Sequence, residues 1–100
     1  MTADLNEIGK TFTSMGQVSA YFDMKGFIVT GKFENSRWPA TLVQVKAGMH
    51  EISFTLKSGK FLNYSGPGYT GHRLQVVTLE DPAGGQTVLV LTSKALINSK

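Results

Sequence analysis

The sequence predicts a mainly β protein, α+β by element count, in which a short N-terminal helix precedes a sheet of antiparallel strands. The first observation is a change in apolar spacing: intervals of three and four residues up to Met15 give way to alternation after Gly16. Those two spacings are typical of a helix and of half-buried strands. The second observation is that short, glycine-containing links join the alternating segments, as in β-hairpins. One helix followed by hairpins is therefore the expected architecture.

Length and composition indicate one folded unit. The chain has 100 residues, of which 41% are hydrophobic and 17% charged, as in ordinary globular proteins. Two compact units would each be too small to bury a core, so we expect a single domain over residues 1–100. No apolar run approaches the ~20 residues that cross a bilayer. The absence of cysteine and of a basic, apolar leader predicts a cytoplasmic protein.

The N-terminal helix is predicted at about residues 4–15. Its apolar residues lie three or four positions apart and therefore share one helix face: Leu5, Ile8, Phe12 and Met15. Gly16 stands where a helix commonly ends. We expect the apolar face of this helix to lie against the sheet.

Seven strands are predicted within about residues 17–92, followed by a short C-terminal tail at 93–100. The expected strands are 17–23, 26–34, 40–46, 49–57, 60–65, 72–80 and 86–92. Two-residue links can join only antiparallel neighbours, which predicts an up-and-down meander. Seven consecutive short strands curl strongly, so we expect a small barrel or a strongly rolled sheet, with the helix closing one side or end.

The last two predicted strands are apolar on both faces. In the other predicted strands, apolar and polar residues alternate, which indicates one buried face. This alternation is absent from segments 74–79 and 88–91. A strand pair of this kind must be covered twice. The barrel interior supplies one cover, and either the helix or another subunit supplies the second. Self-association into a homo-oligomer is therefore one expectation.

Nothing in the sequence resembles an active site, and we expect a protein that is not an enzyme and holds no cofactor or metal. Residues 66–71 match the spacing G-x-G-x-x-G, but a strand pattern follows them where a dinucleotide site needs a helix. His50 lies on the apolar face of its strand, and no second ligand stands at metal-binding spacing. His72 is expected at the polar edge of a loop.

The leading functional hypothesis is a nucleic-acid-binding module. Successive hairpin turns alternate between the two ends of a meander, which gathers basic and aromatic residues at one end. Such residues on a small β-barrel can follow a phosphate backbone and stack bases, so a single strand is the favoured ligand. The predicted binding residues are Lys25, Lys46, Tyr64, Tyr69, His72 and Arg73.

Two other classes of function stay open. In the first, the chain is a protein–protein assembly or regulatory protein that acts as a homo-oligomer through an open edge strand or the doubly apolar strands. Its predicted contact residues are Arg37, Trp38, Leu89 and Leu91, with Trp38 serving either as an exposed anchor or as a seal at the barrel mouth. In the second, the barrel encloses a small ligand, although its interior candidates are large enough to fill it.

Overall fold

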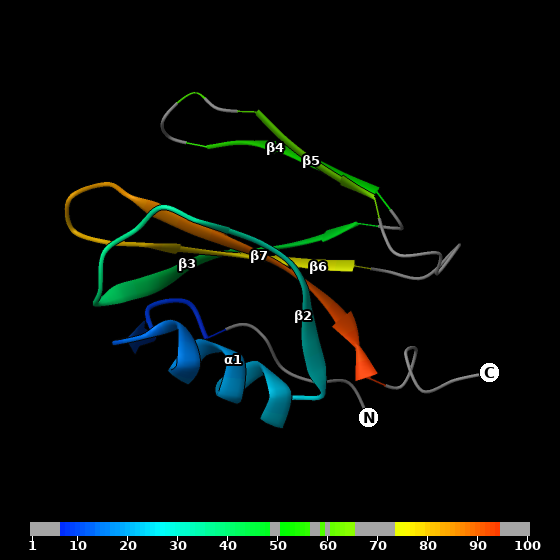
Figure 1. The fold of residues 1–100 in the computed structure, drawn as a ribbon, viewed down its shortest axis with the longest axis horizontal. Coiled ribbons are helices and arrows are strands. Elements are labelled where there is room, and N and C mark those ends of the chain that lie inside the picture. The colour runs from blue at the N-terminus through cyan, green and yellow to red at the C-terminus, as the bar shows by residue number, and fades with distance from the viewer. Residues whose placement is uncertain (1–6, 49–50, 57–58, 60, 66–73, 95–100) are drawn as a thin grey trace.

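A computed structural model describes residues 7–48, 51–56, 59, 61–65 and 74–94, and the structural statements below refer to these residues. The elements in chain order are β1 (Thr11–Phe12), α1 (Met15–Met24), β2 (Phe27–Glu34), β3 (Ala40–Gly48), β4 (Glu51–Thr55), β5 (Phe61–Ser65), β6 (Leu74–Glu80) and β7 (Gln86–Ser93) (Figure 1). The predicted class, mainly β with one short N-terminal helix before antiparallel strands, is confirmed. The described part of the chain contains no helix with the length and hydropathy needed to cross a bilayer.

The predicted position of the helix is wrong. Helix α1 occupies the segment that was expected to form the first strand, 17–23, whereas Phe12 lies on the short strand β1 opposite Ala40. The helix begins after Ser14, whose Oγ accepts a hydrogen bond from the Gln17 N–H at 3.2 Å. Gln17 in turn accepts a hydrogen bond from the Thr13 N–H at 2.9 Å. This reciprocal arrangement resembles a capping box, and it fixes the helix start downstream of the predicted one.

The strands form two sheets, and the predicted meander order is only partly correct. The larger sheet has the order β1-β3-β6-β7-β2, and β4 pairs with β5 in a separate two-stranded sheet. The consecutive pairs β4–β5 and β6–β7 are hairpins as expected. However, β2 pairs with β7 and β3 pairs with β6, so β3 and β2 flank the β6–β7 hairpin. The five-stranded sheet is strongly curled into a half-barrel (Figure 1).

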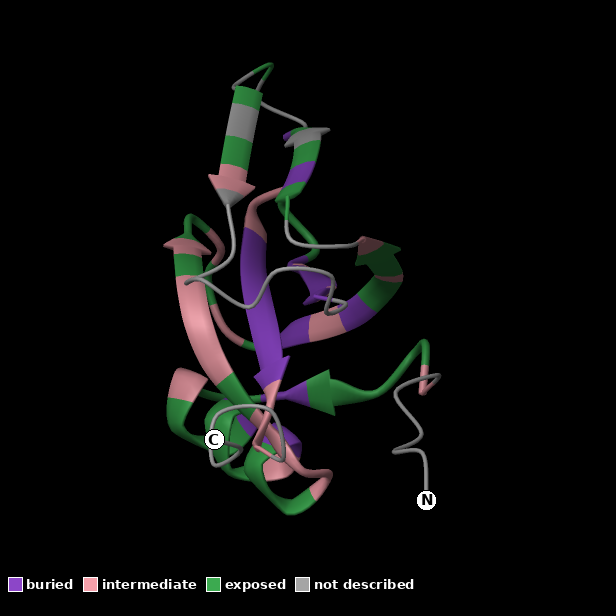
Figure 2. Cartoon of the chain, turned by 90° about the vertical axis from the view of Figure 1, so that its right-hand side faces the viewer, coloured by how far each residue is buried: buried purple, intermediate pink, exposed green. Residues whose placement is uncertain are grey.

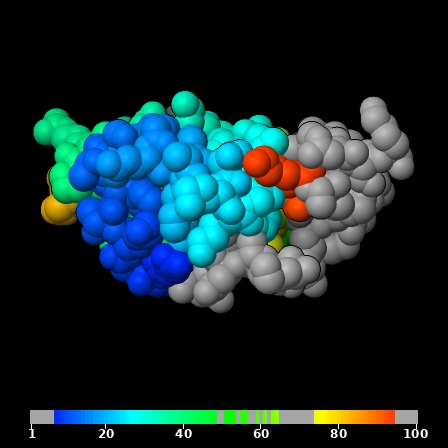
Figure 3. Space-filling model, turned by 90° about the horizontal axis from the view of Figure 1, so that it is seen from below, coloured from blue at the N-terminus to red at the C-terminus, as the bar shows by residue number. Residues whose placement is uncertain are grey.

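One face of the large sheet packs against α1. Val18 and Phe22, four residues apart on the helix, are fully buried against the sheet. The buried core on this side consists of Phe12, Val18, Phe22, Ala40, Leu42, Val77, Leu79, Leu89 and Leu91. Seen from this side, α1 and the beginning of β2 lie next to each other on the surface (blue to cyan in Figure 3). Burial of each large apolar side chain stabilises the fold by about 1.5–3 kcal/mol.

The opposite face of β6 and β7 packs beneath the β4–β5 hairpin. The buried core on this side consists of Ile52, Leu56, Leu74, Val76, Val88 and Val90. Buried residues accordingly concentrate between the helix and the hairpin (purple in Figure 2). The expectation that β6 and β7 are covered twice is confirmed, but the second cover is a hairpin of the same chain.

Asp81 ties two loops of the fold together. Its side chain is only 5% exposed. One carboxylate oxygen accepts hydrogen bonds from the N–H groups of Ala83 and Gly85, both at 2.9 Å, within the β6–β7 turn. The other accepts the N–H of Arg37 in the β2–β3 connection. These bonds, that from Arg37 first, hold the pKa of Asp81 below its ordinary value.

We expect Asp81 to make the stability of the protein depend on acid pH. Because its folded-state pKa is depressed, its contribution is complete above the ordinary aspartate pKa and is lost as pH falls through the lower folded-state value. Asp81→Asn is expected to lower the free energy of unfolding at neutral pH and to flatten its decline in acid. Denaturant unfolding between about pH 2 and pH 7 measures both effects. The control Glu51→Gln changes an exposed carboxyl on β4 and is expected to leave neutral-pH stability nearly unchanged.

Candidate binding edge along strand β2

Strand β2 lies at an edge of the five-stranded sheet, with β7 on one side and no described strand on the other. At its two ends, the Lys94 N–H bonds to the Gly26 carbonyl at 2.9 Å, and the Asn35 N–H bonds to the Gln86 carbonyl at 3.0 Å. Hydrogen bonding alternates along an antiparallel pair, and the register shifts by one residue between Val29 and Gly31. The backbone groups that point away from β7 are therefore those of Phe27, Val29, Lys32 and Glu34.

The β4–β5 hairpin holds the bulge in the middle of β2. The Tyr64 hydroxyl donates a hydrogen bond to the Thr30 carbonyl at 3.0 Å. Its ring lies so close to Gly31 that a Cβ there would stand 2.7 Å from Tyr64 Cε1. The Thr30 hydroxyl lies 3.0 Å from that of Thr92 and donates to the Val90 carbonyl at 3.2 Å. The bulge is thus fixed from both sides, and the absence of a side chain at Gly31 allows Tyr64 to reach it.

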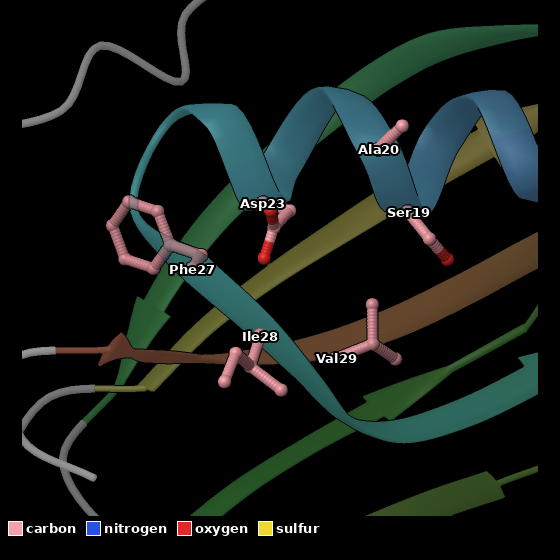
Figure 4. A pocket seen from close by; sticks show the side chains of 6 residues that line it. All are labelled: Ser19, Ala20, Asp23, Phe27, Ile28 and Val29. Atoms are coloured by element: carbon pink, nitrogen blue, oxygen red, sulfur yellow. The ribbon is translucent and has the colours of Figure 1, made fainter. Parts of the chain in front are cut away.

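A groove follows β2 on the side of α1. Its larger part, about 430 Å³, is lined by Ser19, Ala20, Asp23, Phe27, Ile28 and Val29 (Figure 4). The adjoining part, about 310 Å³, is lined by Met15, Ser19, Val29, Thr30, Gly31 and Lys32. Ser19 and Asp23 point from the helix toward β2, while Val29 points back toward the helix (Figure 4). Because the two parts share Ser19 and Val29, they form one continuous groove beside the free edge.

The exposed side chains of β2 differ between its two halves. In the first half, Ile28 is 37% exposed. In the second half, Lys32 and Glu34 are exposed, and neither makes an ion pair with another described residue. Charged side chains on an edge strand restrict which strands can pair with it. This edge therefore combines backbone groups that point away from β7 with a pattern of charged side chains.

The described members of the predicted nucleic-acid site are largely engaged within the chain. The Lys25 ammonium lies 3.4 Å from Glu7 Oε2 and 5.4 Å from the centre of the Tyr21 ring. The Tyr21 hydrogen bond, and after it Lys25, holds the pKa of Glu7 below its ordinary value. Tyr64 is half-buried, and its hydroxyl is bound to Thr30. Lys46 is exposed and donates to the Ser53 carbonyl at 3.5 Å.

Strand directions place Lys25 and Lys46 toward the same end of the sheet, as predicted. Phe27 at the start of β2 pairs with Ser93, Gly48 at the end of β3 pairs with Leu74, and Gln75 pairs with Leu91. The remaining predicted residues, Tyr69, His72 and Arg73, lie outside the described residues. Nucleic-acid binding at this end stays a prediction.

The predicted protein-contact residues fall into two groups. Leu89 and Leu91 are fully buried in the core beneath α1, so neither is available to a partner on the folded chain. Trp38 is half-buried and packs against the same core, as the interpretation of a seal requires. Arg37 is exposed, and its backbone N–H is bound to Asp81. The β2 edge contains none of these four residues.

Sequence reasoning missed this edge because a meander would have given β2 two neighbouring strands. The alternating charges Lys32 and Glu34 are the signal that could have found it, since charges on one face are common on edge strands. Among the described residues, no three histidine, cysteine, aspartate or glutamate side chains gather where they could hold a metal ion. His50 and His72 lie outside those residues. No protein-family model matches the chain, and comparisons with curated proteins and with solved structures find no similar protein.

Proposed function

We propose that this chain is a protein-binding module that accepts an extended segment of another chain along the free edge of β2. The observation that carries the proposal is the row of outward-facing backbone groups at Phe27, Val29, Lys32 and Glu34, beside a groove. An added strand would satisfy these groups through main-chain hydrogen bonds. Side chains of the added strand that face α1 would enter the groove, which gives the interaction its specificity.

The makeup of the groove supports a peptide as its ligand. Phe27, Val29 and Met15 offer apolar contact, while Ser19 offers a hydroxyl. Asp23 lies at the other end, where its carboxylate pairs with the Lys94 ammonium at 2.9 Å. Apolar pockets next to a free strand edge are the combination by which β-strand addition selects its ligands. The proposed activity is binding, with no chemical step.

The proposal is tested with peptides selected from a displayed random decapeptide library for binding to the full chain. Selected peptides are then titrated against Lys32→Pro and Lys32→Ala. Proline removes the outward N–H, and an edge strand tolerates it there because β7 does not use that group. Alanine removes the charge but keeps the N–H. We expect Lys32→Pro to weaken peptide binding about tenfold or more, because the variant loses a main-chain hydrogen bond and the strand geometry at this position. Lys32→Ala is expected to bind the peptide nearly as tightly as the parent chain does.

Hydrogen exchange supplies the second readout of the same experiment. Bound peptide is expected to protect the amides of Phe27, Val29, Lys32 or Glu34, which point away from β7. Thermal unfolding of Lys32→Pro shows whether the variant is still folded. Failure to select any peptide, or selected peptides that bind folded Lys32→Pro as well as the parent chain, would contradict the proposal.

A further inference from the structure

Resting on the proposed function of the β2 edge, we infer that its partner is a second copy of this chain, paired antiparallel so that Lys32 of each copy lies opposite Glu34 of the other. The two copies are then related by a twofold axis through Phe33. The two half-barrel sheets join edge to edge into one sheet, as in isologous dimers.

The backbone of β2 permits this register. Lys32 and Glu34 both direct their N–H and C=O groups away from β7, because their partners Leu89 and Thr87 occupy non-hydrogen-bonded positions of the β2–β7 pair. Lys32 of one copy and Glu34 of the other can therefore exchange two main-chain hydrogen bonds. Phe33, on the axis, directs its own groups toward Val88 within its own sheet and needs none from the second copy.

The bulge limits pairing to the second half of β2. At Thr30 the carbonyl is already bound by the Tyr64 hydroxyl, and the Tyr64 ring lies against Gly31. The run of free backbone groups is interrupted there. Beyond the bulge, the edge is free at Lys32 and Glu34, which gives a short paired segment centred on Phe33.

Charge selects this register over its neighbours. Lys32 and Glu34 are two residues apart and therefore lie on the same face of the strand, where both are exposed. In the inferred register, each lysine faces a glutamate directly, which forms two ion pairs across the dimer. A register shifted by two residues places Lys32 opposite Lys32 or Glu34 opposite Glu34, and directly opposed like charges destabilise a sheet. The same charges that discourage other strands thus favour a second copy.

Reversing the charges tests the inference. Sedimentation equilibrium at low salt is measured for the parent chain, Lys32→Glu, Glu34→Lys and the double variant with both changes. Each single variant replaces two attractive contacts by two repulsive ones, and we expect its dimerisation to weaken about tenfold or more. The double variant restores both pairs and is expected to dimerise within about threefold of the parent chain.

Mixing the two single variants supplies a matched control. Lys32→Glu carries two acids at these positions and Glu34→Lys two bases, so the equimolar mixture is expected to form a heterodimer while each variant alone remains mainly monomeric. Both side chains are exposed, and circular dichroism checks that each variant is folded.

Three results would overturn the inference: a parent chain that stays monomeric to millimolar concentration, single variants that dimerise as the parent does, or a mixture that fails to associate. The parent chain could stay monomeric while binding of the selected peptides still requires the N–H of residue 32. This combination would show that the β2 edge pairs with a foreign strand but not with β2 of a second copy. That outcome separates failure of this inference from failure of the proposed function.

Discussion

Replacement of Leu89 by alanine is expected to lower the free energy of unfolding by about 2–5 kcal/mol, the range for a fully buried leucine whose removal leaves a cavity. Leu89 is 0% exposed and belongs to the core between β7 and α1, together with Val18, Phe22 and Leu79. The helix is tied to the sheet at both of its ends and cannot easily close the gap. Denaturant unfolding followed by circular dichroism measures the loss.

Ile28→Ala is the matched control for this prediction. It removes a β-branched side chain from the edge strand, where the residue is 37% exposed, and is expected to cost less than about 1.5 kcal/mol. A loss for Leu89→Ala no larger than that for Ile28→Ala would contradict the prediction, because it would mean that the core closes over the missing side chain.

In β6 and β7 the face of each residue could be predicted from the sequence, because side chains alternate along a strand. Val76 and Val88 face the hairpin, while Val77 and Leu89 face the helix, as the doubly apolar pattern requires. The order of the strands could not be predicted in the same way. Alternation reports which side of a sheet a residue occupies, and it contains no information about which strand lies beside it.

The position of the helix could have been predicted from its capping residues. The pattern Ser14-x-x-Gln17 precedes two apolar residues four positions apart, Val18 and Phe22, and this combination indicates a helix start. The competing stripe through Phe12 has the right spacing, but Phe12 is buried on β1, where it pairs with β3. The apolar residues of both segments lie three or four positions apart. Spacing alone therefore could not distinguish the true helix from the segment that was predicted.

The candidate site depended on information that a single sequence lacks. Whether β2 has a free edge is decided by its pairing with β7, which lies more than fifty residues away along the chain. Tyr64 looked like a surface aromatic available for stacking, and its contact with Thr30 arises only when the β4–β5 hairpin folds over the sheet. Of the predicted site, Lys25 and Lys46 lie toward the same end of the sheet, because antiparallel strands alternate in direction whatever their order.

Gly85→Ala is expected to destabilise the fold by about 1–3 kcal/mol, the usual cost of forcing an extra carbon into a packed site. A Cβ at this position would stand 2.5 Å from the Asn35 carbonyl oxygen, 2.8 Å from Asp81 Oδ2 and 2.9 Å from Ser36 Cα. The atoms of Asn35 and Ser36 belong to the backbone, and neither can retreat freely. Asn35 donates to the Gln86 carbonyl at 3.0 Å, and the Ser36 hydroxyl is hydrogen-bonded to that of Thr87, which is fully buried.

The same substitution elsewhere in the chain is expected to have the opposite sign. Gly16 lies in the first turn of α1, where the nearest atom to an added Cβ is Ser14 Oγ at 3.7 Å, an ordinary contact. Gly16→Ala is expected to raise the free energy of unfolding by about 0.4–1 kcal/mol, because alanine has less backbone freedom to lose on folding. Chemical denaturation of the two variants side by side measures both effects. If both variants lost stability equally, the close approach of the β2–β3 connection to the β6–β7 turn would not explain the effect at Gly85.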